Sequence, residues 1–208
     1  MRLSRTFSLT TAAGLLAMTA SAIEARAPQA APATGGAAAP APANTTPNPP
    51  VGGAVMDATK PIGVNAAAAP NLTTLVAAAK AADLISTLSG PGPYTVFAPT
   101  NDAFGRLAPG TVDNLMKPAN KASLAKVLTY HVVPGTITLE DLDKRIKAGG
   151  GSTTLTTVEG ETLTVTNPGG AFQLTDVNGN KSYIETPDVH QSNGIVHVVN
   201  GVLVPKLG

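Results

Sequence analysis

Three histidines are the residues of this chain best suited to metal chemistry. They are His131, His190 and His197, and imidazole is a common ligand of transition metals. His190 and His197 are seven residues apart, so on one continuous strand they would face opposite sides, and the intervening Asn193-Gly194 turn leaves their geometry open. No carboxylate or thiolate is spaced to complete a site. We therefore expect no metal and no cofactor.

Acidic residues and nucleophiles give no sign of catalysis. Glu140, Asp141 and Asp143 share one predicted helix with three basic residues at 144–147, a pattern typical of a solvated charged face. The chain has no cysteine and lacks the G-x-S-x-G, G-x-x-x-x-G-K-[ST], G-x-G-x-x-G and H-E-x-x-H motifs. We therefore expect a protein that is not an enzyme and assign no catalytic residue.

The charge balance argues against nucleic acid as a partner. The 208 residues include 14 Lys and Arg against 13 Asp and Glu, a formal net charge of +1. A near-neutral chain has no electrostatic footprint for nucleic acid or anionic lipid. The lack of cysteine also means that no disulfide stabilises the fold.

The N-terminus has the pattern of a secretory signal peptide over residues 1–22. Arg2 and Arg5 form a basic start, an apolar run of 16 residues follows at 7–22, and Ala20-Ser21-Ala22 fits a cleavage site. Ala25-Arg26-Ala27 is a second candidate, which would extend the signal to residue 27. The run is too short for a bilayer core of about 30 Å. We expect export, with no transmembrane anchor after cleavage.

Residues 28–53 form an Ala/Pro-rich segment with almost no large apolar side chain. Such a segment cannot bury enough surface to offset the entropy of ordering. We interpret it as a disordered tether, either a spacer that holds a domain off a surface or a dispensable linker.

The globular part is predicted at 55–206, with helices first and strands after. Apolar spacing predicts a helix from Leu72 with Asn71 as its cap, and Val133-Pro134-Gly135 is expected to end another helix. A capping box is expected at Thr138 and Asp141. The order of elements favours an α+β fold over a parallel α/β sheet.

Several short strands are predicted in the second half of this domain. Residues 182–185 and 189–191 are taken as separate strands, and the turn at Asn200-Gly201 leads into a last apolar segment at 202–205. The nearly continuous apolar run 195–199 is expected to be a central strand covered on both faces.

One stretch, Tyr94 to Phe104, links the two halves. It is predicted to be a buried strand that ends at Pro99 and turns into a helix capped by Thr100, Asn101 or Asp102.

Three motifs in order resemble the fasciclin-like domain family. Residues 95–104 resemble its first signature box, 193–205 resemble its second, and Tyr130-His131 lies between them where the family carries a Tyr-His motif. The resemblance covers nearly the whole globular part and is closest to small exported bacterial single-domain members. It implies an α+β wedge, with a β-sandwich-like core of about seven strands and helices packed around it.

The resemblance also implies candidate partner-binding residues. Tyr130 and His131 match the Tyr-His motif, and Asp188 and Val189 stand where the family often has Asp-Ile. For His131 a structural role competes with adhesion and is favoured, in which the ring ties the helix end to a loop and interacts with the helix C-terminus when protonated. His197, in its apolar strand, is expected to be a hydrogen-bonded core residue.

Two functions follow as hypotheses. The first is a non-enzymatic cell-adhesion or extracellular protein-interaction module, secreted, periplasmic or on the cell surface, which binds an envelope protein or matrix component. The alternative is a periplasmic or secreted small-ligand carrier that uses a groove between helices and sheet. We expect a monomer in either case; the residues do not identify the partner.

Overall fold

The computed structural model describes residues 47–206. The predicted signal peptide and most of the predicted tether lie outside these described residues. Within them, no helix is long and apolar enough to cross a membrane.

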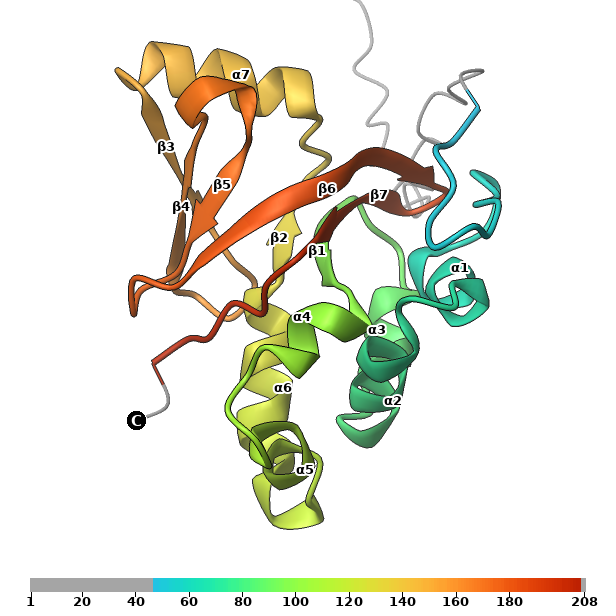
Figure 1. Ribbon diagram of the computed structural model, residues 1–208. Helices are drawn as coiled ribbons and strands as arrows, with labels where there is room; N and C mark the ends of the chain where they lie inside the picture. The colour runs from blue at the N-terminus through green and yellow to red at the C-terminus, as the bar shows by residue number, and fades with distance from the viewer. Residues whose placement is uncertain (1–46, 207–208) are drawn as a thin grey trace, which may run out of the picture. The chain divides into compact units, whose positions relative to one another are not determined.

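Seven strands form one sheet in the order β2-β1-β7-β6-β5-β4-β3 (Figure 1). Their bounds are β1 Tyr94–Pro99, β2 Val132–Pro134, β3 Ser152–Thr156, β4 Thr162–Thr166, β5 Gln173–Thr175, β6 Lys181–Gln191 and β7 Gly194–Val199. β1 and β7 pair in parallel, and every other neighbouring pair is antiparallel. The predicted α+β class and the number of strands are confirmed.

The helices separate into two groups. Most precede β2 and pack on one face of β1 and β7, whereas α7 lies beside β3 and β4 at the opposite end of the sheet (Figure 1). The α-helices are α1 Ile62–Ala68, α2 Thr73–Ala81, α3 Ile85–Leu88, α4 Asn101–Gly105, α5 Thr111–Leu115, α6 Lys121–Tyr130 and α7 Leu139–Ala148, and two 3₁₀ turns span Pro118–Asn120 and Pro168–Gly170.

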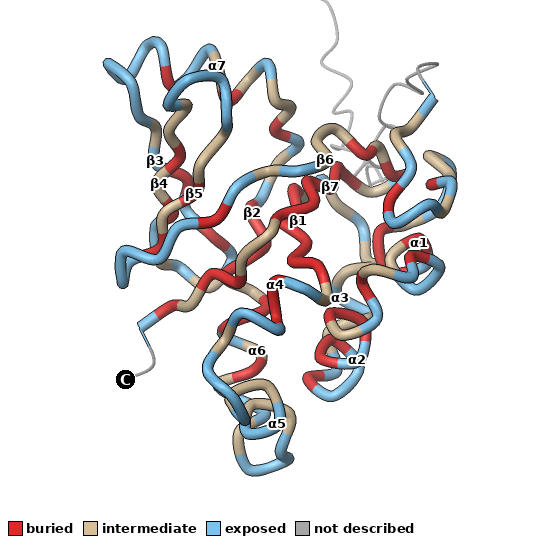
Figure 2. Tube along the Cα trace, viewed as in Figure 1, coloured by how far each residue is buried: buried red, intermediate tan, exposed pale blue. Residues whose placement is uncertain are grey.

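β1 and β7 are buried on both faces, as the apolar run of β7 predicts (Figure 2). Val96 and Val198 belong to a first apolar core, shared with α2 and α6, while Phe97 and Val199 point into a second core. This second core unites side chains of β1 and β7 with side chains of β3, β4, β5 and α7. The sheet therefore curls around it, which makes the β part sandwich-like.

The ends of the curled sheet meet. The Val158 amide, just after β3, donates a hydrogen bond of 2.8 Å to the Val132 carbonyl of β2. The short strand β2 was not expected, because Pro134 and Gly135 directly follow a helix and read as a simple stop. Such a strand is fixed by its pairing with β1, a contact that local residue types do not encode.

β6 is one long strand where two were predicted. Its pairing with β7 shifts between Ile184 and Thr186 and again between Thr186 and Val189. Pro187 cannot donate a hydrogen bond to the ladder, and Asp188 has a positive φ of 54°. These residues predict the end of a strand, but in the structure the strand continues through a β-bulge. Residues 202–204 do not form a strand.

The ordered domain begins before residue 55, which corrects the predicted end of the tether. The Asn48 side-chain Nδ2 donates to the backbone carbonyl of His190 at 2.7 Å, and the Asn48 Oδ1 accepts from the backbone N–H of His190 at 2.8 Å. Val51 is only 2 % exposed. One long-range pair of hydrogen bonds and one buried valine thus attach residues 48–53 to the domain, although their composition resembles that of a linker.

Candidate functional site

The Tyr-His motif lies in the interior, at the end of α6. The Tyr130 hydroxyl donates to the Thr162 carbonyl at 2.8 Å and accepts from the Val177 amide at 3.3 Å. Tyr130 is fully buried, and this burial raises the pKa of its hydroxyl to about 12. The side chain therefore ties α6 to β4 and to the turn after β5.

His131 joins the end of α6 to the C-terminal segment. Its Nε2 accepts from the Leu203 amide at 3.0 Å, so the ring proton resides on Nδ1, which donates to the Val127 carbonyl at 2.7 Å. Burial lowers the pKa of His131 to about 4. The expected structural role, in which the ring ties the helix end to another segment, is confirmed. The interaction expected of the protonated ring does not arise at neutral pH, because the buried ring is neutral there.

The Asp-Val pair has a comparable structural role on β6. The Asp188 Oδ1 accepts from the Leu139 amide at 2.9 Å, at the first residue of α7. The Asp188 amide in turn donates to the His197 Nδ1 at 3.2 Å, and the His197 Nε2 donates to the Ile137 carbonyl at 2.8 Å. Burial lowers the pKa of His197. This residue is a hydrogen-bonded core histidine, as its place in an apolar strand predicts.

Three of the four residues predicted to bind a partner lie in the interior of the domain. Tyr130, His131 and Val189 are buried, and the half-buried Asp188 uses its carboxylate to hold α7. The resemblance placed the motifs correctly along the chain, but it could not tell contact residues from residues that hold helix ends. None of the three buried side chains can reach a partner in this structure.

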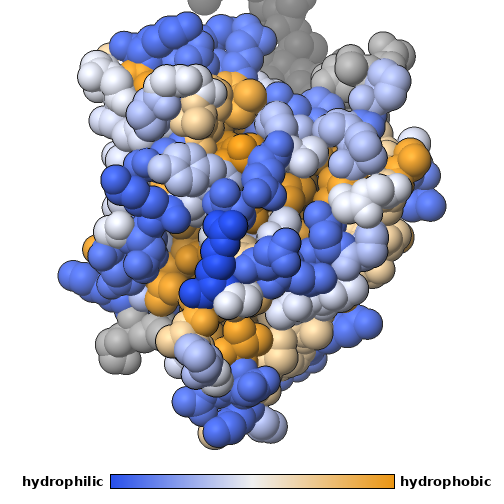
Figure 3. All heavy atoms as spheres, viewed as in Figure 1, coloured by the Kyte–Doolittle hydropathy of each residue, from blue (hydrophilic) through white to orange (hydrophobic). Residues whose placement is uncertain are grey.

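The acidic residues of α7 form the solvated face that their spacing predicts. Glu140 pairs with Lys144 at 2.8 Å and Asp143 pairs with Lys147 at 2.5 Å, one turn apart on the helix. The surface around α7 is hydrophilic in Figure 3. Among residues 47–206, no group of three His, Asp or Glu side chains is arranged to hold a metal ion.

The polar residues that organise the helices are Asn101 and Asn193, one from each signature box. The Asn101 Oδ1 accepts from the Thr74 amide at 2.9 Å, and its Nδ2 donates to the Pro70 carbonyl at 3.1 Å. Asn101, from the first turn of α4, thus caps the start of α2. The prediction that Asn71 is this cap is wrong: its side chain makes no cap bond, and its Oδ1 is buried without a partner.

Asn193 holds two further helices from the turn between β6 and β7. Its Oδ1 accepts from the Ile62 amide at 2.9 Å, at the start of α1. Its Nδ2 donates to the Leu88 and Gly90 carbonyls, each at 2.9 Å, at the end of α3. The two asparagines together fix α1, α2 and α3 over the sheet.

We expect Asn101→Ala to lower the free energy of unfolding by about 1–2 kcal/mol, since it leaves the first turn of α2 without its side-chain cap. Urea denaturation of the variant measures the change. Asn114→Ala makes the same substitution at an exposed position of α5 and should change the free energy by less than about 0.5 kcal/mol. Equal effects for the two variants would contradict the capping role.

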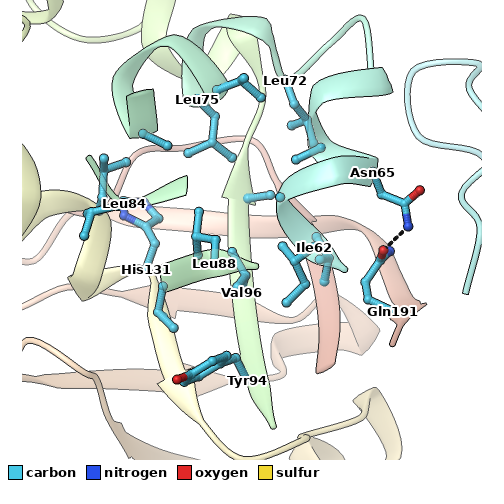
Figure 4. A pocket seen from close by; sticks show the side chains of 18 of the residues that line it. Ile62, Asn65, Leu72, Leu75, Leu84, Leu88, Tyr94, Val96, His131 and Gln191 are labelled. Carbon is cyan, nitrogen blue, oxygen red and sulfur yellow. Dashed lines mark hydrogen bonds between the residues drawn. The ribbon is translucent and has the colours of Figure 1, made fainter. Parts of the chain in front are cut away.

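An apolar cavity of about 80 Å³ lies beneath the three fixed helices. Its walls come from α1, α2 and α3 on one side and from β1, β6 and β7 on the other. Leu75 points into it from α2 and Leu72 from the position just before α2, while Ile62 of α1 and Val96 of β1 also line it (Figure 4). Among the residues that the structure describes, no Asp, Glu, Lys or Arg lines it. This cavity occupies the place between helices and sheet where the carrier hypothesis requires a groove.

Four of the polar side chains that line the cavity, those of Asn65, Gln191, Thr129 and His131, are hydrogen-bonded to other protein groups. Asn65 donates to the Gln191 Oε1 at one edge (Figure 4) and accepts from the Asp57 amide. At another edge, the Thr129 hydroxyl donates to a carbonyl of its own helix, and both ring nitrogens of His131 are bonded. The cavity is thus suited to apolar groups and offers no catalytic pair.

The sequence model of the Fasciclin domain matches residues 70–205. The chain belongs to the fasciclin domain family. Protein sll1483 of Synechocystis is 45 % identical over 144 residues, which are 68 % of this chain and 72 % of that protein. Immunogenic protein MPB70 of Mycobacterium bovis is 35 % identical over 150 residues, 70 % of this chain and 69 % of that protein.

The fold has a solved counterpart in a fasciclin domain pair from the insect cell adhesion molecule Fasciclin I. The TM-score is 0.61 at 20 % sequence identity, and the match covers 72 % of this chain. The chain spans about half of that structure, 51 % of its length. At this identity the likeness establishes the fold, and the fasciclin family assignment rests on the sequence matches.

Proposed function

We propose that this fasciclin domain protein is an exported, non-enzymatic module for cell adhesion or extracellular protein interaction. The observation that carries the proposal is the family match over residues 70–205. Two relatives support it: a cell surface glycolipoprotein of Mycobacterium bovis, MPB83, is 35 % identical over 150 residues, and the structural counterpart belongs to a cell adhesion molecule.

The described fold suits a binding role that needs no chemistry. The polar side chains Asn101, Asn193 and His131 of its three motifs form hydrogen bonds within the domain that hold helices and the C-terminal segment in place. The partner surface in this proposal is therefore composed of exposed side chains outside the Tyr-His and Asp-Val motifs. An envelope protein or matrix component remains the proposed partner.

The test is surface attachment of cells that lack the gene. We expect a loss of attachment that the full chain restores, while a chain lacking residues 1–22 does not, because the latter has no export signal. Crosslinking on intact cells, followed by recovery of the chain, should identify the partner. Normal attachment without the gene, together with the absence of any crosslinked partner, would overturn the proposal.

A further inference from the structure

The cavity under α1–α3 has properties that specify a class of ligand. Its volume of about 80 Å³ is roughly half of the 150 Å³ that accommodates benzene in an engineered apolar cavity. A water molecule needs two to four polar partners. Asn65, Gln191, Thr129 and His131 are bonded to other protein groups, which leaves the hydroxyls of Tyr94 and Thr87 as the other polar side-chain groups of the lining. A small, uncharged apolar group fits this space better than water does.

The cavity walls reach the protein surface. Val158 lines the cavity, yet 45 % of its surface is exposed to solvent. Thr87 of α3 also lines the cavity and is exposed to solvent. Apolar surface therefore continues from the interior to the outside of the domain. A ligand longer than the cavity could keep its end inside while the rest extends over Val158.

The short helix α3 covers part of the cavity with few buried contacts. α3 spans only Ile85–Leu88 and has no fully buried residue, yet Ile85 and Leu88 both line the cavity. The helix is held at its end by Asn193 and, just before it, by an ion pair between Asp83 and Lys121 at the surface. Few buried contacts at a segment are the mark of low local stability, so α3 is the element that can yield to a ligand.

We propose that this cavity binds the hydrocarbon end of a single-chain amphiphile, whose head group remains outside. The chain end fills the empty space and makes apolar contacts with Leu72, Leu75 and Val96, so each methylene that enters the cavity is removed from water. No Asp, Glu, Lys or Arg within residues 47–206 lines the cavity, so the described lining offers the head group no ion pair. This ligand site goes beyond the interaction function proposed above and does not depend on it.

The experiment uses the full chain and dodecanoate labelled with ¹³C at its terminal methyl group. We expect saturable binding by NMR titration, with nuclear Overhauser contacts from the labelled methyl to Leu75 and Val96. Uncharged dodecanol should bind within about threefold of dodecanoate, because the chain end and not the head group enters the cavity. Contacts from the methyl group to any other part of the surface would overturn the proposal.

Two alanines of α2 provide a matched pair of variants. Ala79 is buried and lines the cavity, whereas Ala77 is exposed on the same helix. Ala79→Leu should weaken dodecanoate binding at least tenfold by filling the space, and Ala77→Leu should change it less than twofold. Equal affinities of the two variants would overturn the proposal.

A surface variant keeps the test decisive if Ala79→Leu does not fold. Val158→Asp places a carboxylate where the apolar lining of the cavity reaches solvent. The position is exposed enough to tolerate the charge. It should weaken dodecanoate binding at least fivefold with an unchanged melting temperature. Unchanged binding would overturn the proposal, and cell attachment, measured separately, reports on the interaction function alone.

Discussion

Phe97→Ala is expected to lower the free energy of unfolding by about 3–5 kcal/mol, the usual cost of removing a buried aromatic side chain. Phe97 has no exposed surface and lies in the second core, where the two ends of the sheet meet. Its ring also stacks on that of His197, with centroids 5.6 Å apart. The substitution therefore removes apolar contacts that join β1 to the distant strands, and the rigid surroundings cannot close the space.

Urea denaturation at pH 7 measures this loss, provided that the slope of the transition stays constant. Phe97→Leu is the graded control: it keeps most of the buried apolar surface and should cost clearly less than Phe97→Ala. A shift within about 0.5 kcal/mol for Phe97→Ala is typical of surface positions. Such a result would place the side chain outside the core and refute the described packing of β1.

The burial of Phe97 illustrates what local sequence can predict. β1 and β7 contain apolar residues on both faces, so their burial on both faces of the sheet follows from residue type alone. The capping box at Thr138 and Asp141 also forms as expected, with Thr138 accepting from the Asp141 amide at 3.1 Å. In each case the signal lies within a few residues along the chain, where propensity and periodicity act.

Local sequence signals do not predict which residues position the helices. Asn101 serves α2, which precedes it by 20 residues or more, and Asn193 serves α1 and α3 from beyond residue 190. Asn71 has the better local pattern for a cap, yet Asn101 takes the role because tertiary packing brings it to the helix end. The cavity has the same origin, since its walls come from elements that meet only in the folded chain.

His131 leads to the second large effect, a loss of stability in mild acid. Its pKa is about 4 in the folded protein against an ordinary value of about 6.5. The unfolded chain therefore binds a proton between pH 6.5 and pH 4 while the folded protein does not, and protonation favours unfolding throughout that range. Stability from this histidine is complete above pH 6.5, falls as the pH drops, and levels off below pH 4.

The free energy of unfolding is expected to fall by about 3 kcal/mol between pH 7 and pH 4 because of His131, at about 1.4 kcal/mol for each pKa unit. His197 acts in the same direction, since burial lowers its pKa as well, and carboxylates also titrate in this range. His131→Gln isolates the contribution, because glutamine retains a donor and an acceptor but does not titrate.

We expect His131→Gln to be less stable than the native chain at pH 7, because an amide cannot reproduce both bonds of the ring to Val127 and Leu203. The difference between the two proteins should then shrink as the pH falls from 6.5 to 4, since only the native chain loses stability through residue 131. Urea midpoints measured at half-unit steps of pH give both curves. Parallel curves over this range would show that His131 does not resist protonation in the folded state, and that its ring is not held as a neutral link between α6 and the C-terminal segment.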